Sequence, residues 1–83
     1  MKYIVIELKT EIDESVISTI YQYDNIAEAK QKFYLILADA TVSEYLCHAA
    51  LIVQNTGMII DAGFFDHRPE TDNNDNYILI ENE

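Results

Sequence analysis

The segment 24-DNIAEAKQKFYLILADA-40 decides the fold of this chain. From residue 26 to residue 40 its apolar side chains recur at three- and four-residue spacing, which is the period of an amphipathic helix. Asn25 followed by Glu28 is typical of a helix N-terminus, because these side chains can bond backbone amides that the first turn leaves free. The apolar stripe consists of Ile26, Ala29, Phe33, Ile36, Leu37 and Ala40. We therefore expect one helix with one buried stripe.

The sequence before this helix predicts a hairpin of two strands. Residues 2–9 (KYIVIELK) alternate between two sets of side chains, which is the period of a strand. Residues 16–23 (VISTIYQY) are rich in the β-branched and aromatic types that favour strands. The polar residues 10–15 between them are expected to form the connecting loop.

The sequence after the helix predicts a second hairpin. Residues 47–54 (CHAALIVQ) and 58–65 (MIIDAGFF) flank the tripeptide Asn55-Thr56-Gly57. Glycine at this place favours a tight turn, because it adopts the left-handed backbone angles that such turns require. The element order is therefore strand, strand, helix, strand, strand.

This order predicts an α+β fold, in which a mostly antiparallel four-stranded sheet carries one helix on one face. We expect a single domain over residues 1–65. Residues 66–83 are polar and acidic apart from a short apolar run at 77–80 (YILI). They are expected to form a linker, and the apolar run is a possible short fifth strand at the sheet edge.

Composition limits the classes of partner. The 83 residues include 15 acids and 5 bases, for a net charge of −10, which opposes direct binding to nucleic acid or to an anionic membrane. No run approaches the roughly 20 apolar residues of a membrane span. The single cysteine, Cys47, cannot form an intramolecular disulfide, and the N-terminus has no signal-peptide pattern. We expect a cytoplasmic protein.

The titratable residues do not predict a catalytic site. Cys47 and His48 are neighbours in a predicted strand, so their side chains point to opposite faces and cannot act as a nucleophile and base pair. Cys47 is interpreted as a small core residue, and His48 as a possible hydrogen-bond partner of Asp61 across the second hairpin. Two glycines, Gly57 and Gly63, are too few for a phosphate-binding loop, so no nucleotide cofactor is expected.

A calcium-loop pattern near the C-terminus is superficial. Asp72, Asn74, Asn76 and Glu83 have the spacing of the first, third, fifth and twelfth loop positions. Tyr77, however, occupies the sixth position, where the sharp turn requires glycine. We therefore expect neither a metal nor a cofactor.

The most informative feature is surplus hydrophobicity on the sheet. A helix of 15 residues is about 23 Å long and covers one sheet face. We expect it to cover the side of Ile4, Ile6 and Leu8, which leaves apolar residues on the other side for a partner. The expected interface residues are Tyr3, Val5, Ile59 and Phe65 on the sheet and Leu35 on the far side of the helix.

Three segments carry a resemblance to a known group of proteins. They are 2-KYIVIEL-8, 27-AEAKQKFYLILADATVS-43 and 48-HAALIVQNTGMII-60. Up to about Phe65 the chain resembles a family of small uncharacterised proteins encoded in phages and prophages of Gram-positive, Firmicutes-type bacteria. The resemblance implies a phage or prophage setting in the cytoplasm of a bacterial host, and it carries over no catalytic or binding residues.

The sequence therefore predicts a phage-type accessory protein that acts as a protein-interaction module and not as an enzyme. Its expected partner is a second copy of itself, in a homodimer formed by the sheet face without the helix, or another protein. The alternative is an acidic inhibitor that imitates nucleic acid and blocks a host protein handling it, in an anti-defence or anti-CRISPR-like role.

Overall fold

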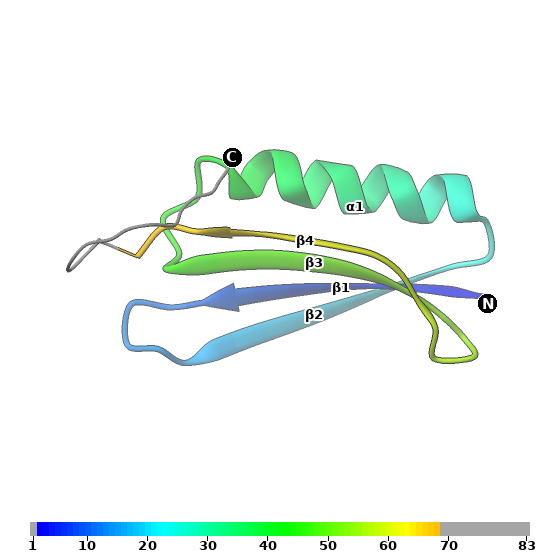
Figure 1. Ribbon diagram of the computed structural model, residues 1–83, viewed down its shortest axis with the longest axis horizontal. Helices are drawn as coiled ribbons and strands as arrows, with labels where there is room; N and C mark the ends of the chain where they lie inside the picture. Colours follow the sequence, from blue (N-terminus) through cyan, green and yellow to red (C-terminus); the bar gives the residue numbers. More distant parts are fainter. Residues whose placement is uncertain (1, 69–83) are drawn as a thin grey trace.

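Figure 1 shows a computed structural model of the chain, which describes residues 2–68. Within these residues one helix lies on one face of a four-stranded sheet. The elements are β1 (Tyr3–Thr10), β2 (Val16–Tyr23), α1 (Ile26–Ala40), β3 (Cys47–Gln54) and β4 (Ile59–Asp66). The predicted element order and the α+β class are confirmed.

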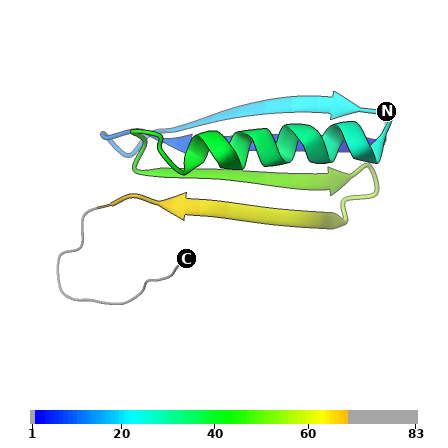
Figure 2. The same cartoon turned by 90° about the horizontal axis from the view of Figure 1, so that it is seen from above.

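The sheet has the strand order β2-β1-β3-β4, and every pair of neighbours is antiparallel. β2 and β3 therefore run parallel on either side of β1, and α1 joins them by crossing over the sheet. Seen from above, the helix lies over β1 and β3, with β2 and β4 on its two sides (Figure 2). This crossover is right-handed, as almost all such connections are.

The helix begins where the sequence predicted. Asn25 has extended backbone angles, and its side-chain oxygen accepts hydrogen bonds from the amides of Ala27 at 2.7 Å and Glu28 at 3.3 Å. At the other end the Thr41 hydroxyl donates to the Ala38 carbonyl at 2.7 Å. In the part of the chain that the structure describes, no helix is long and apolar enough to cross a membrane.

The two hairpins close through different turns. Between β1 and β2, Asp13 accepts hydrogen bonds from the backbone amide and the hydroxyl of Ser15 at 3.0 Å and 2.7 Å. Between β3 and β4, Gly57 has φ of 96°, a left-handed angle that confirms the role predicted for it. The β3–β4 pairing also shifts register at Ile52/Val53, so this hairpin contains an irregularity next to its turn.

The core lies between the helix stripe and one side of the sheet. Its fully or nearly fully buried apolar residues are Val5, Ala29, Phe33, Ile36, Ala50 and Ile52. Tyr3, Tyr21 and Tyr23 pack around these residues from the sheet. On the β4 side a methyl group on Gly63 would come within 3.0 Å of Leu37 Cδ1, so glycine lets the helix approach closely there.

The described fold continues past the boundary expected at Phe65. The amide of His67 donates to the Leu46 carbonyl at 2.7 Å, and its ring Nε2 lies 2.6 Å from the Ala40 carbonyl oxygen. These bonds attach the residues after β4 to the loop between α1 and β3. The fifth strand considered at residues 77–80 and most of the expected linker lie outside the described residues.

We predict that Asn25→Ala lowers the free energy of unfolding by about 1 kcal/mol, because two amides of the first helical turn lose their acceptor. Asn25→Asp is the matched control, since it keeps an oxygen at the same place and should stay close to wild type. Urea unfolding followed by circular dichroism measures both. Equal stability of Asn25→Ala and wild type would contradict the capping role.

Candidate interaction surface

The two faces of the sheet differ sharply in what covers them. Paired residues of neighbouring strands share a face, so Val5 lies with Tyr21 and Ile52 on one side. This is the helix side, where Val5 and Ile52 are completely buried. The opposite side, which contains Ile6 with Ile20 and Leu51, has no covering element among residues 2–68.

We call this second side the open face. It comprises sixteen positions: Ile4, Ile6, Leu8, Thr10, Val16, Ser18, Ile20, Gln22, Cys47, Ala49, Leu51, Val53, Ile59, Ala62, Phe64 and Asp66. None of these residues is buried, and the exposed fraction reaches 69% for Phe64 and 58% for Ile20. Aliphatic and aromatic side chains dominate the face, and its one charged residue, Asp66, stands at the end of β4.

The open face is comparable in size to the largest apolar patch on a typical monomer. Four strands at about 4.8 Å spacing and eight residues at about 3.3 Å each give a footprint of about 19 Å by about 26 Å, or roughly 500 Å². The largest apolar patch on a typical monomer is about 300–600 Å². Side chains that stand out of the plane add accessible area, toward the ~800 Å² per partner of a standard interface.

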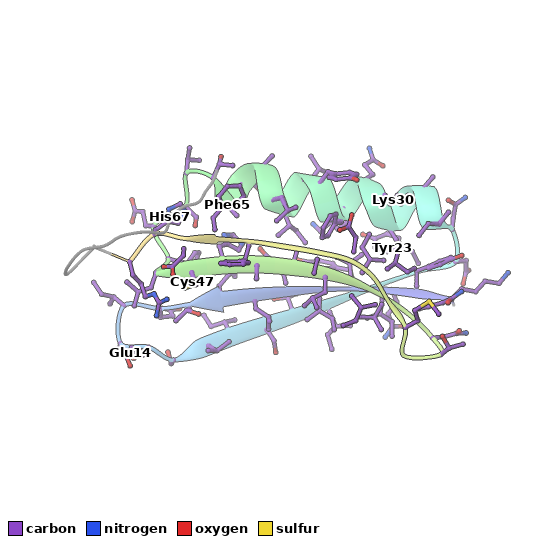
Figure 3. All side chains as sticks on the ribbon, in the orientation of Figure 1. Glu14, Tyr23, Lys30, Cys47, Phe65 and His67 are labelled. Atoms are coloured by element: carbon purple, nitrogen blue, oxygen red, sulfur yellow. The ribbon has the colours of Figure 1, made fainter. Side chains whose placement is uncertain are left out.

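The structure places three of the expected interface residues on the helix side. Val5 is part of the core, and Tyr3 packs against that core. Phe65 pairs with the buried His48 and stacks on His67 with ring centroids 6.3 Å apart, so it also belongs to this side (Figure 3). The expectation that the helix covers Ile4, Ile6 and Leu8 is therefore wrong, and the face assignment is inverted.

The physical reason for the inversion is the fit of the helix to small side chains. On the helix side Ala50 and Gly63 leave room for a close approach, and Ala29 and Ala40 present little bulk from the helix itself. Tyrosine rings then fill the flanks of the helix, as the labelled Tyr23 illustrates in Figure 3. The larger aliphatic residues are left on the opposite side.

The two other expected interface residues are exposed. Ile59 pairs with Val53 on the open face and has an exposed fraction of 59%. Leu35 lies on the outer side of α1 with an exposed fraction of 56%. Ile59 therefore belongs to the open face, whereas Leu35 is exposed on the helix and is not part of that face.

A buried polar network on the helix side was missed by the sequence reasoning, which paired His48 with Asp61. His48 Nε2 lies 2.7 Å from Glu7 Oε2, and the Tyr21 hydroxyl donates to Glu7 Oε1 at 3.2 Å. Both His48 and Glu7 are buried. The network joins β3, β1 and β2 through one carboxylate. The available signals in the sequence were an acid in one apolar strand and a histidine in another. Their pairing can be predicted only when β1 and β3 are known to be neighbours.

Glu7 is held in its charged form. Burial raises the pKa of its carboxyl, but the hydrogen bonds from His48 and Tyr21 and the nearby charge of Lys9 outweigh burial. The pKa therefore lies below its ordinary value of 4.5. Because a carboxylate only accepts, His48 donates from Nε2, and its buried Nδ1 has no hydrogen-bond partner among the described residues. Tyr45 packs edge-on against the His48 ring, with centroids 5.5 Å apart.

We predict that Glu7→Gln lowers the free energy of unfolding at pH 7 by about 2 kcal/mol, because the charge-assisted bonds are lost. A carboxylate whose pKa is depressed by folding contributes its stability above the unfolded pKa. That contribution is lost as the pH falls through the folded pKa. The difference between wild type and variant should therefore shrink as the pH falls below the ordinary pKa value of 4.5 and through the lower folded pKa.

Urea unfolding at pH 7 and at pH 3 measures this difference. The exposed Glu44→Gln serves as the matched control and should have little effect at either pH. A stability loss for Glu7→Gln that is the same at both pH values would show that the carboxylate charge has no part in it.

Cys47 differs from its expected place in the core. It is half-buried on the open face, at the end where Thr10 and Asp66 are its cross-strand neighbours. Its Sγ lies 3.7 Å from Asp66 Oδ1, and burial followed by the Asp66 charge raises the pKa of the thiol. The thiol is therefore protonated at neutral pH and a weak nucleophile.

The described residues contain no cluster of three or more His, Cys, Asp or Glu side chains placed to hold a metal ion. Comparison of the chain with protein-family models, with curated proteins and with solved structures finds no match. The assignment of a function therefore depends on the geometry described above.

Proposed function

We propose that this protein is a protein-interaction module that forms a homodimer through the open face. One observation carries the proposal: the central residues of that face, Ile6, Ile20 and Leu51, are neighbours on three strands, and no element among residues 2–68 covers them. Contiguous apolar surfaces of this size are often functional contact sites. The phage or prophage setting suggested by the sequence stays part of this proposal.

A second copy is the partner that this surface suits best. A two-fold axis brings the same patch of each subunit together, so the patch must be complementary to itself. An apolar face without opposed charges meets this condition. Two such faces would stack about 10 Å apart, as in β-sandwiches, with each helix on the outside. A domain this small also gains from the added core, because its own core holds few residues.

The net charge of −10 does not prevent this pairing, because Asp66 is the only charged residue of the open face among the residues that the structure describes. The loop between β1 and β2 carries Glu11, Asp13 and Glu14, and the acids of residues 69–83 lie outside the described fold. Like charges on the two copies still repel at long range, and added salt screens that repulsion. Self-association should therefore stay constant or strengthen as the salt concentration rises.

The salt dependence also separates this proposal from the acidic inhibitor. A nucleic-acid mimic would bind a basic surface by charge pairing, and that binding would weaken steeply with salt. An apolar self-association would not. Sedimentation of the pure protein at low and high salt measures how self-association depends on salt, and it requires no knowledge of any second partner.

We predict that wild type has about twice the subunit mass of 9.6 kDa at micromolar concentration and that Ile6→Lys has the mass of a single chain. The unpaired ammonium is costly in a desolvated interface and tolerable on a wet strand. Light scattering coupled to size exclusion measures both masses. A monomeric wild type, or a variant that remains dimeric, would exclude an open-face dimer.

Two controls identify the face. Leu35→Lys also adds a lysine at an exposed apolar residue, but on the outer side of the helix, so it should stay dimeric. Val5→Lys changes the neighbour of Ile6 on the buried side and should abolish the cooperative thermal transition, since it places a charge in the core. A folded Val5→Lys monomer would mean that the two faces are exchanged.

Cys47 provides an independent readout in the unmodified protein. Its thiol lies on the open face and is half-buried in the single chain. We predict that its alkylation by iodoacetamide slows as wild-type protein is concentrated and stays constant in Ile6→Lys, because dimerisation covers the thiol. Equal concentration dependence in both proteins would contradict the open-face dimer.

A further inference from the structure

Among residues 2–68, β2 is an edge strand whose outer side carries no partner. The strand order leaves β1 on one side of β2 and nothing on the other among residues 2–68. A free edge exposes a row of backbone amides and carbonyls that can pair with another strand. The edge of β2 is eight residues long, Val16–Tyr23.

Natural proteins protect free edges with charges, proline or a bulge, and the two edges of this sheet differ in that protection. β4 contains Asp61 and Asp66, and its pairing shifts register near the turn. β2 reads VISTIYQY and contains none of these devices. It is also the strand with β-branched or aromatic residues at six of its eight positions.

β2 is exposed on both of its faces as well as along its edge. Val16 and Ile20 are 60% and 58% exposed on the open face. Ile17 is 41% exposed on the helix side, because α1 lies over β1 and β3 and leaves this end of β2 uncovered (Figure 2). An uncharged strand that is apolar on both faces is suited to lie inside a sheet.

We propose that β2 pairs antiparallel with β2 of a second copy, which extends the sheet to eight strands across the subunit boundary. An antiparallel pair of identical strands has its two-fold axis perpendicular to the sheet. That axis keeps both helices on one side and both open faces on the other. The edge contact therefore joins two open faces into one surface, and it neither requires nor blocks the stacking of those faces.

The charges at the ends of β2 select the register. In an antiparallel pair, residues opposite each other lie on the same side of the sheet. When the two strands are identical, one residue therefore lies on the two-fold axis, opposite the same residue of the other copy. A pair centred on Thr19 would bring Asp24, just after β2, toward Glu14 in the turn before β2 of the other copy, and like charges repel. A pair centred on Ile20 sets Asp24 opposite Val16 and joins two exposed isoleucines. Of these two registers, the one centred on Ile20 is favoured.

The edge contact buries less surface than the open face, so it should form at higher concentration. The test uses Ile6→Lys, in which the open face is disabled, and follows amide hydrogen exchange by NMR at low and high protein concentration. We expect every second amide of β2, the ones directed away from β1, to exchange at least tenfold more slowly at high concentration. The outer amides of β4 in the same sample should not change.

Two further variants in this background test the register. Ile20→Glu sets two carboxylates face to face on the axis and should remove the concentration-dependent protection. Gln22→Glu is the matched control, since it adds the same charge to the same face opposite Ser18 and should keep the protection. Phe64→Lys, at an exposed residue of the open face, replaces Ile6→Lys if the latter does not melt cooperatively.

Outer β2 amides that exchange equally fast at both concentrations overturn the proposal, as does protection that appears on β4 instead. Loss of protection in both Ile20→Glu and Gln22→Glu overturns the register. These outcomes are independent of the open-face dimer. That dimer is judged by the mass of wild type and Ile6→Lys, whereas the edge contact is judged by the amides of β2.

Discussion

The structure depends on one constraint, which is that a single helix covers one face of the sheet. α1 has 15 residues and its buried stripe is built largely from Ala29, Phe33, Ile36 and Ala40. The right-handed crossover from β2 to β3 places this stripe over the middle of the sheet. No second helix exists among the described residues to cover the other side. The core, the open face and the exposed edge of β2 all follow from that arrangement.

The face that the helix covers is the more polar one, which needs a physical explanation. A carboxylate and an imidazole are costly to bury unless they bond each other, and Glu7 and His48 do so at 2.7 Å. Paired, they link β1 to β3, and Tyr21 extends the link to β2. Such a network favours one register of the three strands, because a slip by one residue would leave the Glu7 carboxylate without its hydrogen-bond partners. The open face has no comparable directional contacts.

The helix, strands and turns were predicted closely from the sequence, whereas the face of the sheet that meets the helix was predicted wrongly. The helix over residues 26–40, its cap at Asn25 and the turn at Gly57 follow from local spacing and local chemistry, which the sequence contains. The side of β1 that meets the helix depends on long-range fit. Counting apolar residues favoured Ile4, Ile6 and Leu8, but the helix packs where Ala50 and Gly63 leave space. The same limit hid the Glu7–His48 pair, because its partners are 41 residues apart.

The distribution of charge affects how copies of such an apolar sheet can approach one another. An acidic protein resists uncontrolled association, because copies that approach at random meet like charges first. On this chain the acids of residues 11–14 and of 69–83 supply that repulsion, while β2 and most of the open face stay neutral. Repulsion acts over about 8–10 Å at moderate salt, whereas apolar burial acts at contact. For the association proposed above, arrangements that hold the acidic loops at residues 11–14 apart while the neutral surfaces touch are then favoured.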